Sequence, residues 1–510
     1  MKRITLVISF LALLMGSAFG QGKSGSTPST PTPSGQNQKL DKKLNDKAKN
    51  QPNEKVRVII QRTGPVTTAD NDDVKKQGGK IIRNFHLINA HVVEVPAKVA
   101  DMLTSRPNVK NISIDEPAKA TVATTEPSIV TGADIATQTY GVTGNGIGVA
   151  IIDSGIATHP DLPNVVNAVD FVDSTRTGGY DPFGHGTHVA GTLAGNGAAS
   201  GGMHMGSAPG VGLIDLRVLD GSGSGYTSDV IAAIEWAVTN QNAAGKNGRS
   251  MNIRVINLSL GHEPFESATT DPLTLACRTA VQNGIVVVAA AGNLGKDATG
   301  KTVYGGITSP GNEPTVITVG AVTTWGTYTR QDDAIATYSS RGPTYIDHYV
   351  KPDVVAPGGS IVAAMSPGSY LAVTYPTLQQ DGSYLRLSGT SMATPTVSGA
   401  VALMLQANPS LRPNAVKAAL MFTSEKMNAS PLAQGAGYIN TAGAVNLVEN
   451  IDTTVASGQY WIRNNGLGLN YNNTIANGWS AAWGQTIVWG DSLLGGNTIF
   501  NNTIVWGDTI

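Results

Sequence analysis

Three short segments of the chain carry side chains that could together cleave an acyl bond. Asp153 closes the apolar run VAIID, His185 follows a glycine in GHGTHVAG, and Ser391 lies in GTSMATP. Acyl transfer to a serine needs a hydroxyl nucleophile, an imidazole that removes its proton, and a carboxylate that orients the imidazole. The three segments supply one of each, so Asp153, His185 and Ser391 are the predicted catalytic residues.

Each of these residues also has a structural alternative. A single Asp after a strand and a single Ser before a helix are ordinary helix caps. His185 and His188 are three positions apart and could hold a metal ion, but no Glu follows as in H-E-x-x-H and no third ligand is evident. The joint occurrence of the acid, the imidazole and the hydroxyl favours the catalytic interpretation.

The order of the three groups along the chain separates classes of serine hydrolase. The α/β-hydrolases run Ser, Asp, His and place the serine in G-x-S-x-G. Here the order is Asp153, His185, Ser391, and the serine lies in G-T-S-M-A. The sequence therefore excludes the α/β-hydrolase pattern and matches the class with the order Asp, His, Ser.

The stretches around these residues alternate between apolar strands and helical patterns. The strand patterns lie at 148–152, 213–219, 255–258, 285–290 and 316–319, and helical patterns at 229–240 and 274–282 lie between them. Apolar strands that are separated by helices are typical of a parallel sheet with helices on both faces. We predict a three-layer α/β fold, in which ligands bind at the carboxyl ends of the strands.

Composition divides the chain into five parts. Lys2 and Arg3, a following apolar stretch and then small residues are typical of a cleavable signal peptide. The alternative, a membrane anchor, needs about 20 apolar residues, and this stretch is shorter. We predict a signal peptide at 1–20, a Gly/Ser/Pro-rich linker at 21–37, a small α+β domain at 38–120, the α/β domain at 121–450, and a β-rich extension at 451–510 that is rich in Asn, Gly and Trp. The leader predicts a protein that is secreted, or located at the cell surface or in the periplasm.

Charge and cysteine content narrow the classes of partner. Lys and Arg number 35 and Asp and Glu number 36, so the net charge of −1 favours neither nucleic acid nor an anionic membrane. No segment beyond the leader has the length and apolar character of a membrane span. Cys277 is the single cysteine, so no intrachain disulfide can form, and its helical context indicates a small buried side chain rather than a catalytic thiol.

Five segments resemble the signature sequences of the subtilase family, and they occur in the family's order. They are AIIDSGI around Asp153, HGTHVAGTLAG from His185, VINLSLG at 255–261, IVVVAAAGN at 285–293 and LSGTSMATP around Ser391. The similarity spans about residues 130 to 450, and five matches in order make a chance resemblance negligible. The resemblance implies a subtilisin-like fold and a secreted serine endopeptidase that works through an acyl-enzyme.

The resemblance also implies a role for each residue of the site. Ser391 would attack the scissile carbonyl, His185 would transfer protons, and Asp153 would orient the imidazole. The side chain of Asn293 and the backbone N–H of Ser391 would bind the oxyanion. Ser259, Leu260 and Gly261 would pair with the substrate backbone, and Ala290, Ala291 and Gly292 would line the primary specificity pocket.

The chain departs from the family pattern at a few positions. Thr396 follows the proline where the family usually has His, and Ser398 stands where Ala is common. Leu294 follows Asn293 where some relatives carry an acid, which favours apolar P1 side chains. The residues after Leu193 do not match the Asn-rich calcium loop of the best-known bacterial members. We expect the chemistry to need no cofactor; structural calcium stays an open alternative, and no metal ligand is assigned.

The α+β domain at 38–120 resembles the family's propeptide, an intramolecular chaperone and inhibitor. Its patterns predict strands at 55–61, 80–84, 91–95 and 109–114 and helices at 72–77 and 96–105. The resemblance implies that the chain inhibits itself with this propeptide and cuts itself between about residues 118 and 128. It also implies polypeptide substrates, and we expect a monomer.

The extension contains a repeated hexapeptide. TIVWGD occurs at 486–491 and again at 503–508. Two copies are too few for a self-supporting solenoid, which needs about three, so a docked β-rich segment and a partly ordered tail both stay open. These repeats also suggest an alternative function, a catalytically silent surface-binding module, and an esterase on the same scaffold is a third interpretation.

Overall fold

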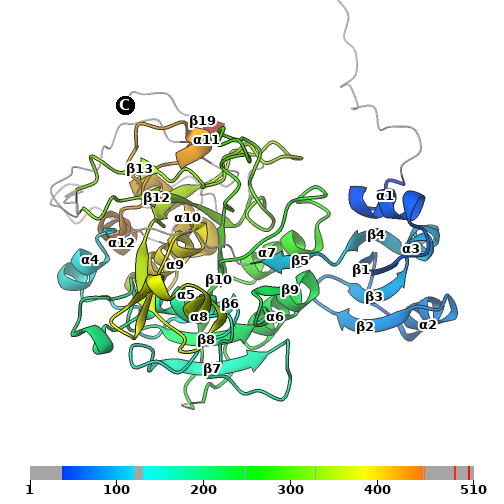
Figure 1. Cartoon of the computed structure of the whole chain (residues 1–510), viewed down its shortest axis with the longest axis horizontal. Helices are drawn as coiled ribbons and strands as arrows, with labels where there is room; N and C mark the ends of the chain where they lie inside the picture. Colours follow the sequence, from blue (N-terminus) through cyan, green and yellow to red (C-terminus); the bar gives the residue numbers. More distant parts are fainter. Residues whose placement is uncertain are drawn as a thin grey trace, which may run out of the picture. The chain divides into compact units, whose positions relative to one another are not determined.

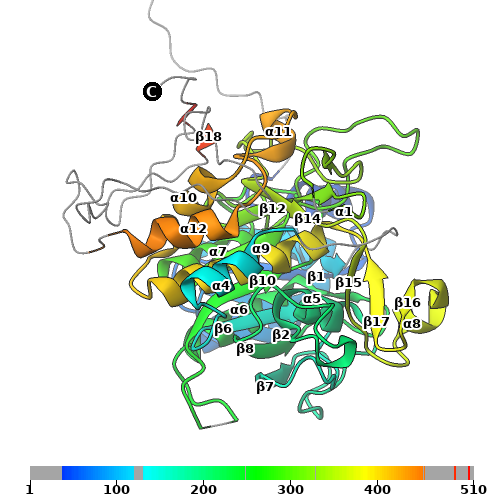
Figure 2. The same ribbon diagram turned by 90° about the vertical axis from the view of Figure 1, so that its left-hand side faces the viewer.

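The computed structural model of the chain describes residues 37–119, 130–246, 248–327, 329–451 and 453, and the dipeptides 488–489 and 504–505. The predicted signal peptide at 1–20, nearly all of the linker at 21–37 and most of the extension at 451–510 lie outside these residues. Figures 1 and 2 show the elements from two directions. Within the described ranges, no helix combines the length and the apolar character that crossing a membrane requires.

A sheet of eight strands forms the middle layer of the larger α/β domain. Its order is β13-β12-β11-β10-β6-β8-β7, with β14 beside β12. The strands are β6 (Gly148–Asp153), β7 (Val165–Asp170), β8 (Gly212–Arg217), β10 (Ile253–Leu258), β11 (Val286–Ala290), β12 (Ile317–Thr323), β13 (Ala334–Ile335) and β14 (Val354–Pro357). Every pair is parallel except β12 with β13. The predicted parallel sheet is confirmed; β13 has only two residues, too few for a periodic signal in the sequence.

Helices cover both faces of this sheet. Successive residues of a strand point to opposite sides, so both faces carry apolar side chains that need cover. In β6, Val149 and Ile151 pack in the cluster that includes the helices of one face. Ala150 and Ile152 pack in the cluster that includes the helices of the other face. The first face carries α4 (Ala133–Tyr140), α5 (His185–Ala194), α9 (Thr390–Ala407), α10 (Pro413–Thr423) and α12 (Thr441–Glu449), and the second carries α6 (Thr227–Thr239) and α7 (Pro272–Gln282).

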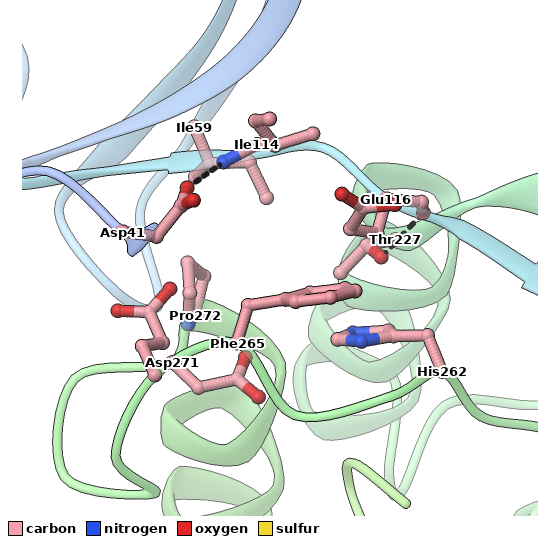
Figure 3. A pocket seen from close by; sticks show the side chains of 10 residues that line it. Asp41, Ile59, Ile114, Glu116, Thr227, His262, Phe265, Asp271 and Pro272 are labelled. Atoms are coloured by element: carbon pink, nitrogen blue, oxygen red, sulfur yellow. Dashed lines mark hydrogen bonds between the residues drawn. The ribbon is translucent and has the colours of Figure 1, made fainter. Parts of the chain in front are cut away.

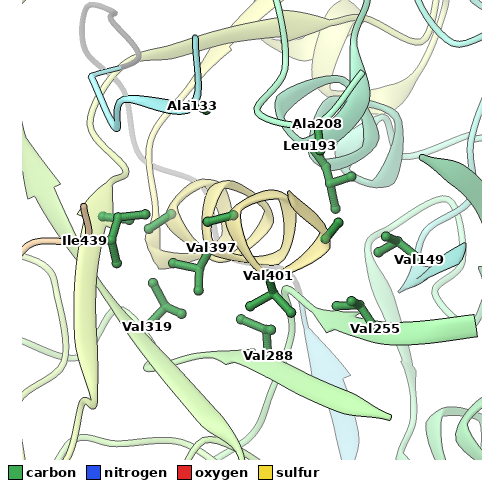
Figure 4. Packing of buried hydrophobic residues seen from close by; sticks show 14 of the residues in the cluster. Ala133, Val149, Leu193, Ala208, Val255, Val288, Val319, Val397, Val401 and Ile439 are labelled. Atoms are coloured by element: carbon green, nitrogen blue, oxygen red, sulfur yellow. The ribbon is translucent and has the colours of Figure 1, made fainter. Parts of the chain in front are cut away.

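Helix α9 lies at the centre of the first face. Figure 4 shows its residues Val397 and Val401 above valines of β6, β10, β11 and β12. All the side chains of α9 from Thr390 to Leu405 are buried. This helix is therefore enclosed by protein on every side, and its hydroxyl-bearing residues need hydrogen-bond partners inside the domain.

Residues 42–114 form a smaller α+β unit with its own core. Its elements are α1 (Lys42–Asn50), β1 (Lys55–Arg62), α2 (Thr68–Lys76), β2 (Lys80–Phe85), β3 (Ala90–Pro96), α3 (Ala97–Leu103) and β4 (Val109–Ile114). The four strands are antiparallel in the order β2-β3-β1-β4. Val58 and Ile60 of β1 face the unit's own helices, whereas Ile59 packs in the cluster of α6 and α7. Burial on both faces explains why Val58, Ile59 and Ile60 follow one another with no polar residue between them.

Two helices of this unit differ from the sequence prediction. The sequence does not predict α1, because Leu44 is its only buried residue and no apolar stripe is visible. Helix α2 begins at Thr68 rather than near residue 72, because Thr67 and Asp70 form a capping box in which each side chain accepts from the other's backbone N–H. The strand predictions hold to within one residue at each end.

The remaining elements are short. They are β5 (Pro117–Lys119), η1 (Ala198–Ser200), β9 (Ser224–Tyr226), β15 (Ile361–Ala364), α8 (Tyr370–Thr374), η2 (Pro376–Leu378), β16 (Gln379–Gln380), β17 (Tyr384–Leu387), α11 (Pro431–Gln434), β18 (Val488–Trp489) and β19 (Ile504–Val505). Strands β18 and β19 come from the two copies of TIVWGD and pair antiparallel with each other.

Candidate active site

Three of the predicted site residues follow neighbouring strands of the central sheet. Asp153 is the last residue of β6, Ser259 follows β10, and Asn293 follows β11. These strands are adjacent and parallel, so their carboxyl ends meet at one edge. His185 is the first residue of α5, and Ser391 is the second residue of α9. The first turns of two helices and the ends of three strands therefore carry all five side chains.

A buried hydrogen bond joins Asp153 to His185. His185 Nδ1 lies 2.8 Å from Asp153 Oδ1, and both side chains are fully buried. A carboxylate only accepts, so Nδ1 carries the proton and Nε2 of the neutral imidazole keeps a free lone pair. Nε2 has no hydrogen-bond partner among the described residues. Asp153 Oδ1 also accepts the backbone N–H of Ser154 at 2.7 Å, which fixes the carboxylate.

The turn that precedes α5 depends on a glycine. Gly184 has a φ of 97°, a conformation that residues with a Cβ rarely adopt. A Cβ at this position would also lie 2.4 Å from Ser369 Oγ. The glycine before His185 is thus explained by backbone geometry and by close packing against the segment before α8.

Ser391 is held by two hydrogen bonds to Ser259. Ser391 Oγ donates to the Ser259 carbonyl at 2.9 Å, and Ser259 Oγ donates to the Ser391 carbonyl at 2.9 Å. No hydrogen bond joins Ser391 Oγ to His185 Nε2 within the part of the chain that the structure describes. The structure thus brings both groups to one edge of the sheet, but it does not bond them directly.

The unusual Ser398 belongs to a polar chain beneath Ser391. Ser398 Oγ donates to Asn257 Oδ1 at 2.8 Å, and Asn257 Nδ2 donates to Ser259 Oγ at 3.0 Å. Ser259 then donates to Ser391, and all four residues are buried. A serine at this position therefore has a partner that an alanine would leave unsatisfied.

Asn293 is oriented by the residue that precedes Ser391. Its Oδ1 accepts from the backbone N–H of Thr390 at 3.0 Å and from Thr390 Oγ1 at 3.1 Å. With the carbonyl end fixed in this way, the amide Nδ2 is the end that remains to donate. Asn293 and Ser391 also line the same pocket, so this amide and the serine hydroxyl serve one cavity.

That pocket has a volume of about 150 Å³ and contains nearly all the predicted substrate residues. It is lined by Ser259, Leu260, Gly261, His262, Glu263, Ala290, Gly292, Asn293, Leu294, Thr308, Thr390 and Ser391. Ala291 does not line it: the residue is fully buried, and its backbone bonds to Val319 and to Thr308. Leu294, which the sequence connects with apolar P1 preference, is 39% exposed.

Sequence reasoning missed Thr308, which lines this pocket between two glycines. A Cβ added at Gly292 would lie 2.7 Å from Thr308 Cγ2, and one added at Gly261 would lie 3.0 Å from Thr308 Oγ1. The two glycines therefore leave room for Thr308 between them. Thr308 immediately precedes Ser309, and no motif marks it, so only the fold reveals this position.

Two aromatic residues beside His185 were also missed. The Phe183 ring lies 6.3 Å from the His185 ring and stacks on Tyr370 of α8 at 5.8 Å. Tyr370 is 187 positions from Phe183 in the sequence, so no local pattern connects them, and Tyr370 is 48% exposed.

His188 and Cys277 have structural positions. His188 Nε2 lies 2.9 Å from the Ile361 carbonyl and 3.0 Å from that of Leu385, and burial lowers the pKa of His188 from 6.5 to about 3. Cys277 is fully buried in α7, and burial raises the pKa of its thiol well above the ordinary value. His188 is therefore a buried residue of the core, and the interpretation of Cys277 as a small buried side chain is confirmed.

The loop after Leu193 does not fit a calcium site. It wraps around Asp161, whose Oδ1 accepts from Ala199 N–H and whose Oδ2 accepts from the Tyr384 hydroxyl, both at 2.7 Å. Calcium needs six to eight oxygen ligands, and here N–H and O–H donors take the carboxylate oxygens. The described residues contain no group of three or more His, Cys, Asp or Glu that could hold a metal ion.

Comparisons with known proteins identify the class. The family model described as "Subtilase family" matches residues 144–437. Serine protease AprX of Bacillus subtilis (strain 168) is 37% identical over 377 residues, which cover 73% of this chain and 82% of that protein. Subtilisin E of the same organism is 35% identical over 374 residues, which cover 73% and 85%.

Among solved structures, fervidolysin from Fervidobacterium pennivorans, a keratinolytic enzyme related to subtilisin, superposes with a TM-score of 0.59 at 22% identity. The match covers 78% of this chain and 62% of the fervidolysin chain, and at this identity it supports the fold alone. The larger domain therefore has a subtilisin-like fold, that of a class of serine proteases. The chain belongs to the subtilase family, peptidase S8.

Proposed function

We propose that this subtilisin-family protease is a secreted endopeptidase that cuts polypeptides with Asp153, His185 and Ser391 and is made as a self-processing precursor. The observation that carries the proposal is the buried Asp153–His185 hydrogen bond of 2.8 Å, which leaves Nε2 free at the edge where Ser391 lies. That arrangement supplies an oriented base for a serine nucleophile. A catalytically silent binding module would not need an oriented base.

In the proposed first step, the Ser391 hydroxyl leaves the Ser259 carbonyl, turns to His185 and attacks the scissile carbonyl. Its proton passes to Nε2, and Asp153 stabilises the resulting imidazolium through Nδ1. The same imidazolium then gives its proton to the leaving amine, which departs and leaves an acyl-enzyme on Ser391. A water molecule, deprotonated by His185, releases the acid in the second half.

The oxyanion is stabilised by two donors on rigid elements. Ser391 is the second residue of α9, so its N–H lies in the first turn, where backbone donors have no partner within the helix. Asn293 Nδ2 is the second donor, since Thr390 fixes the other end of the amide. One such donor typically contributes about 3–4 kcal/mol to transition-state stabilisation.

The proposal that residues 38–120 are an inhibitory propeptide is supported by their contacts with α6. Asp115 Oδ1 accepts the backbone N–H of Ser228 at 2.6 Å, which places a carboxylate at the N-terminus of α6. The Arg57 guanidinium lies 3.9 Å from the Tyr226 ring, and Glu235 accepts the N–H groups of His86 and Leu87.

Strand β5 supports the same proposal. It pairs antiparallel with β9, with Ala118 opposite Gly225, so the end of the small unit adds a strand to the larger domain. Addition of a strand is how extended peptides commonly bind proteins, because the backbone groups pair without regard to sequence. The predicted self-cleavage between about residues 118 and 128 follows directly after this pairing, mostly outside the described residues.

Acidic side chains meet where the two units contact each other. Figure 3 shows Asp41 from the small unit facing Asp271 and its neighbours across a small pocket, with Glu116 beside Thr227. Glu266 lines the same pocket and accepts from Asn111 Nδ2 at 2.7 Å. Burial, together with Asp271 and Asp41, raises the pKa of Glu266 from 4.5 to about 8. Lys43, which pairs with Glu116, and the imidazole of His262 lie at the same position.

We further propose that the chemistry needs no cofactor, that the leader exports the chain, and that the enzyme works as a monomer. The proton-transfer steps above use only side chains, so no metal is required by the mechanism. Calcium with a purely structural role would have to bind elsewhere than the loop around Asp161.

Replacement of Ser391 tests the proposal as a whole. A serine-directed phosphonate should label the wild-type protein one to one and should not label Ser391→Ala, whose casein hydrolysis should fall about a million-fold. Ser391→Ala should also remain an uncut precursor, because its own site makes the cut. Ser410→Ala, a change in an exposed loop residue, should behave as wild type. Identical mature N-termini in wild type and Ser391→Ala would exclude self-processing, and hydrolysis of a simple ester without casein would indicate an esterase.

Replacement of Thr308 tests the specificity pocket. Thr308→Gly should raise the kcat/KM ratio of a Phe substrate over an Ala substrate at P1 by about tenfold, because the space for about two further methyl-sized groups opens. Thr299→Gly, an exposed change in the same connection between β11 and β12, is the matched control and should leave the ratio unchanged. An equal ratio in wild type and Thr308→Gly would show that Thr308 does not limit the pocket.

The acidic contact predicts that propeptide docking weakens as pH rises. Docked Glu266 binds its proton more tightly than undocked Glu266, so docking is fully favoured below about pH 4.5 and loses stability as pH rises toward 8. Hydrogen exchange of strands β1 to β4 is measured in the Ser391→Ala precursor and in the same precursor with Glu266→Gln. The exchange rate of the first divided by that of the second should be larger at pH 8 than at pH 5.5. Glu235→Gln, which removes a different interface carboxylate, should weaken docking equally at both pH values; a wild type that tracks Glu266→Gln at both would contradict the prediction.

A further inference from the structure

The loop before α5 contains a buried carboxylate that the proposed mechanism does not use. Asp181 is only 3% exposed and accepts four hydrogen bonds. Its Oδ1 accepts from Gly184 N–H at 2.7 Å and from Ser154 Oγ at 2.8 Å. Its Oδ2 accepts from the N–H of Thr187 at 2.8 Å and from Thr187 Oγ1 at 2.7 Å. These donors flank both Asp153 and His185 in the sequence.

The two hydroxyl groups extend this network to both sides of the site. Ser154 Oγ donates to Asp181 and accepts the N–H of Gly186 at 2.9 Å. Thr187 Oγ1 donates to Asp181 and accepts the N–H of Ala157 at 2.9 Å. We call each hydroxyl with its two hydrogen bonds a relay. The Ser154 relay connects the segment after β6 to the N–H of Gly186 in α5, and the Thr187 relay connects α5 to the N–H of Ala157 in the segment after β6. Both relays end on the same carboxylate.

A helix cap alone does not require this arrangement. An ordinary cap accepts one or two N–H groups at the start of its own helix. Asp181 accepts two such groups, and it also binds a hydroxyl from the segment after β6, 27 positions earlier in the chain. Burial raises the pKa of Asp181, whereas every one of its four partners is a donor that favours the ionised form.

We propose that Asp181 is a positioning residue that fixes the separation of Asp153 and His185 by tying the end of β6 to the first turn of α5. Ser154 and Thr187 are the two hydroxyls through which it acts. The inference rests on the proposed catalytic function of Asp153 and His185. Loss of a relay lets the first turn of α5 shift against β6, and displacement of a catalytic group by about 1 Å can reduce turnover by about a hundredfold.

Thr187 offers an experiment with matched variants in the full chain. Thr187→Val keeps the shape of the side chain but removes the hydroxyl, and Thr187→Ser keeps the hydroxyl. Thr192→Val is the control, because Thr192 is also a buried residue of α5, and among the described residues its hydroxyl bonds only to the His188 carbonyl. Phosphonate titration counts the folded active sites, so kcat is expressed per active site in every variant.

Thr187→Val should lower kcat about tenfold or more with KM changed less than twofold. Thr187→Ser should restore kcat to within about twofold of wild type, and Thr192→Val should lower the melting temperature about as much as Thr187→Val without lowering kcat. Asp181→Asn should lower kcat further, and if that variant does not fold, the Thr187 variants decide. Equal kcat in Thr187→Val and Thr192→Val would overturn the inference while leaving the proposed function intact. Absence of labelling and hydrolysis in the wild type would instead overturn the proposed function.

Discussion

The buried hydrogen bond between Asp153 and His185 is the interaction on which the account of this protein depends. It requires a carboxylate at the end of β6 and an imidazole at the start of α5 to meet in a fully buried position, 2.8 Å apart. The parallel sheet makes this possible, because β6, β10 and β11 end at one edge and two helices begin there. The glycine before His185, the donors around Asp181 and the bonds between Ser259 and Ser391 all serve this one edge.

The active site requires the parallel sheet to form, and the small unit packs on helices that cover this sheet. A parallel sheet is built from contacts that are distant in the sequence, and such sheets fold slowly. The unit at 42–114 contributes Ile59 to the cluster of α6 and α7, and the residue that follows β4, Asp115, lies at the N-terminus of α6. The small unit therefore caps α6 and packs against α6 and α7, which are the contacts that the proposed propeptide role needs.

Much of the fold and the site could be predicted from the sequence because the signals are local. Apolar runs such as 148–152 indicate buried strands, and short motifs identify Asp153, His185, Ser391 and Asn293. Thr308 and Tyr370 could not be predicted, because their positions depend on how distant segments pack. Helix α1 has only Leu44 as a buried residue, so its pattern is too weak, whereas the start of α2 could have been found from Thr67 and Asp70. The motif predicts Ala291 among the residues that line the pocket, but Ala291 is fully buried and its backbone bonds to Val319 and Thr308 instead.

The most direct test of the central interaction is nitrogen-15 NMR of the histidine-labelled Ser391→Ala chain near neutral pH. The account predicts that His185 is present as the tautomer with hydrogen on Nδ1, with a strongly downfield proton on that nitrogen. This proton signal should disappear in Asp153→Ala and in His185→Ala. A signal that places the His185 proton on Nε2, or one that is unchanged in Asp153→Ala, would contradict the account.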